Sequence, residues 1–397
     1  MKNMRKIRRG LRRCQPEYVF VTALLLAFFL AGAGYLIFAP KQDFSEDENR
    51  ALQAAPELSA EDLLDGSFMD DAEAYVGDHF MLRKEFISLY NAFQYGIGRR
   101  DVGSNYSVSP AEGGVYFGRE GHLYEVLLPD RTGTFARNAQ ALAGFAEAVD
   151  VPVYLLAAPS GSQEQSEKLP LFAPNHNQKE DLQYLRDAVG QEAAVVDVFD
   201  ALSSFYGDYY YKTDHHWNTF GAYAAYQVLC SEMGLSPVSF DSYNLRTVPQ
   251  PFYGTLYSKA VSFFQEPDQM YLPELKEPQE IVQYVNGTQE HQGLYWEEYL
   301  EAKDKYSVYL GGNHGVDVVK NGSVTNGRKL LLLKDSYANS MIPFLITNFS
   351  EIHLIDLRYY SQNVYDYMEE NGITEAAAIY SIKQLCEINI AGKLMVR

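Results

Sequence analysis

Near-continuous apolar runs of strand length recur along the second part of the chain. Five of them are predicted strands: Val153 to Ala158, Val195 to Phe199, Lys329 to Leu333, Ile352 to Leu357 and Ala376 to Ile382. Because such a run has no polar face, both of its faces must be covered in the folded protein.

Segments with helical spacing of apolar residues lie between these runs. The predicted helices are 134–149, 179–189, 217–233, 337–348 and 363–371. Strands that alternate with helices predict an α/β fold, with a mostly parallel sheet and helices on both of its sides. The stretch Phe240 to Gly315 holds five prolines and no clear period. It is predicted to be a long irregular insertion over one end of the sheet, of the kind that often forms a binding or lid structure.

The N-terminal pattern is different. Tyr18 to Ala39 is 22 residues without a charge, which at about 1.5 Å per residue is enough to cross a hydrocarbon core of about 30 Å. Seven basic residues precede it and an acidic stretch follows, so the positive-inside bias predicts a cytoplasmic N-terminus and an extracytoplasmic body at the cell membrane. A cleaved signal peptide is the alternative, because Ala31-Gly32-Ala33 offers small residues for a peptidase.

These patterns divide the chain into four parts. A basic cytoplasmic tail (1–17) is followed by a transmembrane anchor (18–39), a stalk with one or two helices (40–100) and the main domain (101–397), which contains the insertion 240–315.

Charge and cysteine content exclude several classes of protein. After residue 17 the chain carries 26 basic and 51 acidic side chains, a net charge of −25, so a nucleic acid is not an expected partner. The cysteines form neither a C-x-x-C pair nor a zinc spacing. No nucleotide or metal motif appears, so neither a cofactor nor a metal is implied.

The run from Lys329 to Lys334 leads directly into Asp335-Ser336 and a predicted helix. Ligands bind at the carboxyl ends of parallel strands, and a serine that starts a helix has free backbone N–H groups beside it. This placement suits a nucleophile whose attack creates an oxyanion. The same residues are also good helix caps, which is the simpler interpretation.

Thr213-Asp214-His215-His216-Trp217 supplies the groups that a serine nucleophile needs. A serine requires a base, and the base requires a partner that fixes its tautomer. An Asp and a His two residues apart can converge on the serine. The alternative is that both histidines cap a helix or pack on Trp217.

Six segments share a further pattern: Phe44 to Arg50, Gly118 to Tyr124, Thr213 to Asn218, Gly311 to Asn313, Asp335-Ser336 and Asp356 to Tyr360. Together they resemble the bacterial DHHW family, which is similar in turn to the periplasmic alginate O-acetyltransferases of the SGNH-hydrolase superfamily. The resemblance implies a three-layer α/β/α SGNH-hydrolase-like domain in which Ser336 is the nucleophile, His216 the base and Asp214 the orienting acid. His215 falls at a variable position. Lys334 departs from the superfamily, whose nucleophile block begins Gly-Asp-Ser, at a position beside the expected oxyanion hole.

The implied function is O-acetyl transfer to a cell-surface or exported polysaccharide through an acetyl-serine, with a membrane-bound O-acyltransferase as the donor partner. A carbohydrate acetylesterase shares the mechanism, and a non-catalytic scaffold of a modification or export complex is a further alternative. A two-metal DHH phosphoesterase would need more metal ligands than the sequence offers.

Four further residues are candidates for substrate or oxyanion contacts. Asn313 follows two glycines that allow close approach, so its amide is a candidate oxyanion donor beside the Ser336 N–H. Tyr211 and Trp217 flank the acid-base block and either stack on sugar rings or pack in the core. Arg358 either binds an acidic sugar or pairs with a carboxylate.

Overall fold

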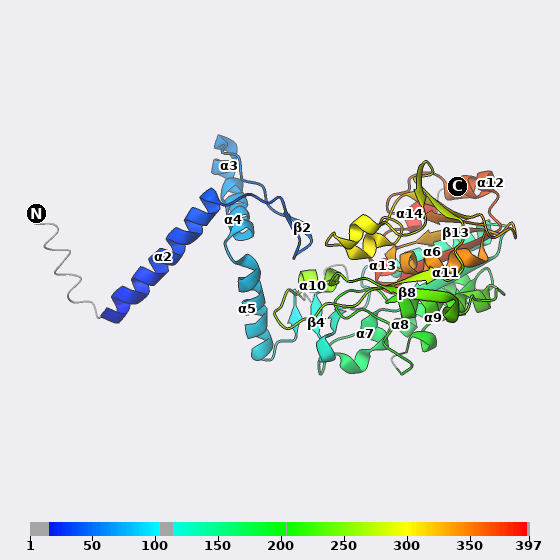
Figure 1. Cartoon of the computed structure of the whole chain (residues 1–397), viewed down its shortest axis with the longest axis horizontal. Helices are drawn as coiled ribbons and strands as arrows, with labels where there is room; N and C mark the ends of the chain where they lie inside the picture. Colours follow the sequence, from blue (N-terminus) through cyan, green and yellow to red (C-terminus); the bar gives the residue numbers. More distant parts are fainter. Residues whose placement is uncertain (1–15, 104–113, 204, 395–397) are drawn as a thin grey trace, which may run out of the picture. The chain divides into compact units, whose positions relative to one another are not determined.

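The computed structural model describes residues 16–103, 114–203 and 205–394, and Figure 1 colours the chain in sequence order. The chain divides into two compact units between Tyr90 and Asn91. The basic residues of the predicted tail lie outside the described residues.

In the described part of the first unit, the first element is an apolar helix, α2 (Pro16–Phe38). It is long and apolar enough to cross a membrane, and a signal sequence would have the same properties. A short hairpin and helices follow: β1 (Phe44–Ser45), β2 (Arg50–Ala51), α3 (Ala60–Asp65) and α4 (Ser67–His79). The division between the two units falls within the next helix, α5 (Arg83–Gly96).

The second unit is built on an eight-stranded mixed sheet. Five adjacent strands are parallel, in the order β14 (Glu351–Ile355), β13 (Lys329–Lys334), β15 (Glu375–Ser381), β6 (Val153–Ala158) and β7 (Ala194–Val196). Each of the five predicted apolar runs overlaps one of these strands. The α/β class and the parallel sheet are therefore confirmed.

Three antiparallel strands extend the sheet beyond β14. They are β12 (Val316–Asn321), β10 (Ile281–Val285) and β11 (Gln289–Gln292). Two of them lie inside the stretch expected to be irregular, so that prediction was wrong for this part. The strand pattern of β10 is hidden because Gln283, a polar residue, faces the interior and is fully buried.

Two apolar cores lie on opposite faces of the sheet, and β13 contributes to both. Leu330 and Leu332 belong to one core, Leu331 and Leu333 to the other, as the two-residue period of a strand requires. On the first face pack α9 (Thr219–Glu232), η8 (Ser336–Met341) and α11 (Ile342–Leu345). On the second face pack α6 (Thr134–Ala148), α8 (Gln178–Val189), α12 (Val364–Asn371), α13 (Ile382–Glu387) and α14 (Ala391–Leu394).

Two helix predictions were wrong. The stalk (40–100) was expected to hold one or two helices and holds three, α3, α4 and α5, and the predicted helix over 337–348 is broken. The segment forms three short pieces, η8, α11 and η9 (Ile346–Asn348), of which two are 3₁₀ turns. Pro343 explains the break, because it has no N–H to donate and its ring clashes with the carbonyl four residues earlier. It stands in the first turn of α11, where a proline is tolerated.

The remaining elements are short and connect or cover the sheet. They are β3 (Asp101–Val102), β4 (Val115–Phe117), η2 (Arg119–Gly121), β5 (Leu123–Glu125), α7 (Gly161–Glu164), η3 (Ser166–Lys168), η4 (Asp200–Leu202), η5 (Phe240–Ser242), β8 (Tyr243–Thr247), α10 (Thr255–Lys259), β9 (Tyr271–Leu275), η6 (Glu297–Leu300) and η7 (Lys305–Val308).

Candidate functional site

Ser336 stands at the carboxyl end of β13, where the strand passes into η8. Asp335 caps this helix: its Oδ1 accepts the N–H of Tyr337 at 2.8 Å. Its Oδ2 accepts the N–H and the hydroxyl of Ser381 at 2.8 and 2.9 Å, which ties β13 to the end of β15. Because Asp335 is the cap, the hydroxyl of Ser336 is left available for another partner.

That partner is His216, and a continuous hydrogen-bonded chain results. His216 Nε2 lies 2.8 Å from Ser336 Oγ, and His216 Nδ1 lies 2.6 Å from Asp214 Oδ1. The same carboxylate oxygen, Asp214 Oδ1, accepts a hydrogen bond from the backbone N–H of His216 at 3.0 Å. Asp214 and His216 are buried. The three residues that the sequence singled out for acid, base and nucleophile are thus brought together across 120 residues of chain.

Asp214 is held by the segment that begins α10. Its Oδ2 accepts the N–H of Thr255 at 2.8 Å and the Thr255 hydroxyl at 3.1 Å. Gly254 packs so closely that a Cβ there would lie 2.2 Å from the Asp214 Cβ. Burial alone would raise the pKa of Asp214, but the neighbouring imidazoles and the hydrogen bonds outweigh it and lower the pKa. Asp214 therefore stays ionised.

Tyr306 covers the face of the His216 ring. The two rings are stacked, with centroids 3.8 Å apart and planes 6° apart. The Tyr306 hydroxyl donates to the backbone carbonyl of Ser336 at 3.0 Å and lies 3.1 Å from Ser340 Oγ, whose own hydroxyl can donate to it. Burial raises the pKa of Tyr306, so the proton stays on its oxygen. Tyr306 thereby fixes the base and the nucleophile relative to each other. No pattern in the sequence marked Tyr306 as a site residue.

His215 lies beside the hydrogen-bonded series Asp214–His216–Ser336 but is not part of it. Its Nδ1 lies 2.6 Å from the Thr255 hydroxyl and its ring centroid 3.8 Å from that of His216. Burial of the His215 ring lowers the pKa of His215, and the nearby His216 lowers it further, to about 4. His215 is therefore neutral near pH 7.

Ligand atoms of Asp214, His215 and His216 lie within 4.8 Å of one another, close enough for a shared metal ion. An ion bound by His216 would replace its hydrogen bond to Asp214 or that to Ser336. The site can therefore support a metal ion or the intact hydrogen-bonded chain, and the two differ in how activity responds to a chelator.

Two aromatic candidates are packed in the interior, so the sugar-stacking interpretation was wrong for them. Trp217 is 0% exposed, and its Nε1 donates to the Tyr337 carbonyl and to Ser340 Oγ, both at 3.0 Å. Tyr211 is buried against Phe252. Neither ring has a face open to a ligand. Trp217 instead anchors the turn that carries His216 onto η8.

The other two candidates have partners of their own. Arg358 forms a two-point ion pair with Asp356, with Nε–Oδ1 at 2.9 Å and Nη2–Oδ2 at 2.6 Å. This is the carboxylate pairing that the sequence offered as one alternative. Asn313 Oδ1 accepts a hydrogen bond from Lys334 Nζ at 2.9 Å.

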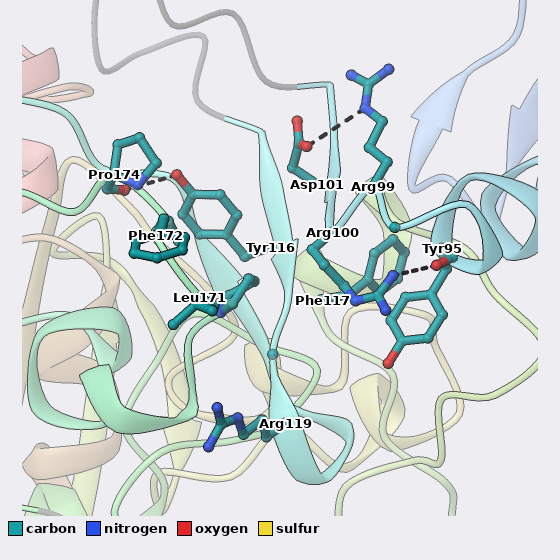
Figure 2. A pocket seen from close by; sticks show the side chains of 14 residues that line it. Tyr95, Arg99, Arg100, Asp101, Tyr116, Phe117, Arg119, Leu171, Phe172 and Pro174 are labelled. Carbon is teal, nitrogen blue, oxygen red and sulfur yellow. Dashed lines mark hydrogen bonds and ion pairs between the residues drawn. The ribbon is translucent and has the colours of Figure 1, made fainter.

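A separate pocket of about 470 Å³ lies between the segment 95–101, β4 and residues 170–174. Figure 2 shows three arginines around it that do not converge: Arg99 points to Asp101, Arg100 lies on the Tyr95 ring, and Arg119 stands at the far end. Because their guanidinium groups are spread out and two of them have partners, the pocket offers no concentrated anion site.

Comparison with known proteins finds a family model that matches part of this chain and solved structures with a similar fold. The family model for DHHW protein matches residues 168–355, which include the whole hydrogen-bonded chain. A DHHW family protein from Eubacterium siraeum is 24% identical, covers 71% of this chain and 94% of its own, and superimposes with a TM-score of 0.62. Bacillus cereus PatB1, in a structure with a sulfonyl adduct, is 22% identical, with coverages of 69% and 96% and a TM-score of 0.57.

The O-acetyltransferase domain of Pseudomonas putida AlgJ is also similar, at 13% identity, with coverages of 70% and 94% and a TM-score of 0.44. No curated protein matches the chain in sequence.

Proposed function

We propose that this chain, which the DHHW family model matches over residues 168–355, is an O-acetyltransferase that acts on a cell-surface or exported polysaccharide through an acetyl-serine intermediate. The main domain is then an SGNH-hydrolase-like α/β/α domain. The observation that carries the proposal is the chain from Asp214 through His216 to Ser336, with its two hydrogen bonds of 2.6 and 2.8 Å. The identification of an acetyl group as the group transferred, and of a glycan as the acceptor, rests on the family resemblance.

The first half of the reaction forms the acetyl-enzyme. Ser336 Oγ attacks the acetyl carbonyl of the donor while His216 Nε2 takes the hydroxyl proton. Asp214 stabilises the imidazolium that results. The tetrahedral intermediate collapses, the C–O bond to the donor breaks, and His216 returns its proton to the departing oxygen. As the first residue of η8, Ser336 has a backbone N–H without a partner inside the helix, and this group is a donor for the oxyanion.

The second half transfers the acetyl group. A sugar hydroxyl attacks the acetyl-serine carbonyl and gives its proton to His216, which then reprotonates Ser336 as the ester bond to the enzyme breaks. Water in place of the sugar would make the protein an acetylesterase. The acceptor therefore decides between the two activities. The donor partner implied by the resemblance is a membrane-bound O-acyltransferase.

A labelling experiment tests the nucleophile. We expect phenylmethylsulfonyl fluoride to add one sulfonyl group to the soluble body (residues 40–397), found on Ser336 by peptide mass spectrometry. A chromogenic acetyl ester should be turned over, and both reactions should disappear in Ser336→Ala. Ser350→Ala is the matched control, because Ser350 lies just before β14, at the end of the sheet opposite Ser336, and its hydroxyl donates to the Arg328 carbonyl at 2.7 Å. Turnover by Ser336→Ala at the parent rate would refute the proposal.

The apolar helix α2 leads to a second prediction, about topology. We propose that α2 stays in the membrane as an anchor, with the body outside the cytoplasm, because its apolar residues continue beyond the small residues Ala31 to Ala33. Protease added to intact spheroplasts should digest the body and leave a small stub in the membrane fraction. A mature protein whose N-terminus lies just after Ala33 would show that the helix is a cleaved signal.

A further inference from the structure

Lys334 is the last residue of β13 and is only 1% exposed. Burying an ammonium group is costly unless hydrogen bonds compensate for the lost water. A glycine or an apolar residue would continue the pattern of β13 without this cost. The presence of a lysine two residues before Ser336 therefore calls for a specific role.

The Lys334 ammonium is hydrogen-bonded to two asparagine side chains. Nζ lies 2.9 Å from Asn313 Oδ1 and 2.7 Å from Asn339 Oδ1. An ammonium can only donate, so each carboxamide must turn its oxygen toward Lys334 and its NH₂ group away. Lys334 thus fixes which way both amides face.

The two amides differ in what their NH₂ groups meet. Asn339 Nδ2 approaches the Gly312 carbonyl at 3.4 Å and Asn313 Oδ1 at 3.3 Å. For Asn313 Nδ2, no acceptor is found in the part of the chain that the structure describes. Asn313 therefore holds a donor that is oriented but unused.

The loop that carries Asn313 is rigidly built. Leu310, Gly311 and Gly312 all have positive φ angles, of 64°, 74° and 100°, and such conformations persist only where the surroundings enforce them. The fully buried Gln283 holds the loop in this conformation, because its Nε2 donates to the Leu310 carbonyl at 2.8 Å. The Trp296 Nε1 donates to Gln283 Oε1 at 3.0 Å.

Trp296 also restricts the next residue of this loop. A Cβ at Gly311 would lie 2.9 Å from the Trp296 ring, so the ring leaves room for glycine alone. The loop is thus held from two sides at the point where it delivers Asn313 to Lys334.

We propose that Lys334 is a positioning residue, which holds the Asn313 carboxamide so that its NH₂ group donates to the oxyanion formed when Ser336 attacks an ester. This inference rests on the proposed function. This role explains how an oxyanion hole can form although a lysine stands where the superfamily has glycine. The backbone N–H of Ser336 and the amide of Asn313 would be the two donors.

Charge supports the same role. In the described part of the chain, no ion pair neutralises Lys334, and its hydrogen bonds go to neutral amides. Burial lowers its pKa to about 8, against the opposing effect of Asp356, Asp317 and Asp335, while Arg358 lowers it further. Near pH 7 the group is largely protonated, so a positive charge lies behind the developing oxyanion.

A double-mutant cycle tests the proposal. We expect Asn313→Ala to lower kcat for a chromogenic acetyl ester about 10²–10³-fold, as loss of one oxyanion donor does, and Lys334→Met to lower it similarly. The double variant should lose no more than the larger single loss, because both changes remove one donor. Lys334→Gln should restore part of kcat, because its NH₂ group can donate to Asn313 Oδ1. Lys329→Met, at the opposite end of β13, is the control.

Two further measurements, made beside kcat, separate the outcomes. Sulfonyl labelling and thermal unfolding give the folded, reactive fraction, to which kcat is normalised. Losses that multiply in the double variant would overturn the role of Lys334 while leaving the proposed function intact. Turnover that survives Ser336→Ala would overturn both.

If Lys334→Met does not fold, the dependence of kcat on pH tests the role of Lys334 instead. Once Lys334 loses its proton it can accept a hydrogen bond, so the Asn313 amide is no longer held. We expect kcat of the parent and of Lys329→Met to fall above pH about 8, and the normalised kcat of Asn313→Ala to show no such fall. The charged groups that face Lys334 are Asp335 at the end of β13, Asp317 on β12, and Asp356 and Arg358 after β14. A fall in both the parent and Asn313→Ala, or in neither, would overturn the proposal.

Discussion

Replacing His216 with alanine is expected to slow acetyl-ester turnover about 10⁴-fold or more, to about the level of Ser336→Ala. The reason is that His216 Nε2 is the group within hydrogen-bonding distance of Ser336 Oγ, at 2.8 Å, and without a base the serine remains a weak nucleophile. Members of such a triad act as a unit, so the double variant His216→Ala/Ser336→Ala should be no slower than either single variant. Turnover of a chromogenic acetyl ester under saturating substrate measures this.

Asp214→Asn should cost about 10⁴-fold as well, by analogy with the loss when the orienting acid of a serine protease becomes an amide. An amide nitrogen facing His216 Nδ1 would favour the wrong tautomer of the imidazole. His215→Ala is the matched control: it removes an adjacent imidazole that is bonded to Thr255 and is neutral near pH 7. It should retain most activity.

A metal site would give another pattern in the same assay. Both histidines would then matter about equally, and a chelator would remove the activity. For the proposed triad we expect a chelator to leave turnover unchanged. If His215→Ala and His216→Ala lowered turnover by comparable factors, the assignment of His216 as the base and His215 as a residue outside the triad would be wrong.

The acid, base and nucleophile could be proposed from sequence because each lies in a short local pattern. Asp214 and His216 are two residues apart on one turn, and Ser336 follows a run of four leucines that reads as a buried strand. What sequence could not supply are the contacts made across the insertion. Tyr306, Gly254 and Thr255 lie far along the chain from the residues they hold, and no local pattern marks them.

The strands inside the insertion were missed for a related reason. β10 has the polar Gln283 at its central buried position, and β11 reads Gln-Glu-His-Gln, without an apolar residue. Gln283 is buried because it holds the Leu310 carbonyl and Trp296. A polar residue that supports a loop near the site thus obscured the strand that carries it.

Aromatic residues near the site were misjudged because type alone does not tell a core ring from a binding surface. Trp217 and Tyr211 flank the acid-base block in sequence, yet both rings point inward. Arg358 was ambiguous in the same way until its pairing with Asp356 two residues earlier was visible. Burial and partner choice are properties of the packed structure, and adjacency in sequence does not determine them.

Gly254→Ala is expected to lower turnover at least about 10²-fold although the substitution adds one methyl group. The added Cβ would lie 2.2 Å from the Asp214 Cβ and 2.3 Å from its Oδ2, far inside van der Waals contact. Asp214 cannot retreat without losing the N–H of Thr255 or the imidazole of His216, and a misplacement of about 1 Å costs about this much in rate. The backbone contributes no strain, because the φ angle of Gly254 is −82°.

Gly144→Ala is the matched control. Gly144 lies within α6, and nothing lies within 4 Å of a Cβ built there, so alanine should stabilise the protein by about 0.5–1 kcal/mol and leave turnover unchanged. Overpacking at Gly254 should instead destabilise it by about 1–3 kcal/mol. Thermal unfolding and turnover per sulfonyl-reactive enzyme separate the two effects. If Gly254→Ala retains the parent rate per reactive site, the contact between Gly254 and Asp214 does not set the geometry of the acid, and the support assigned to the start of α10 is wrong.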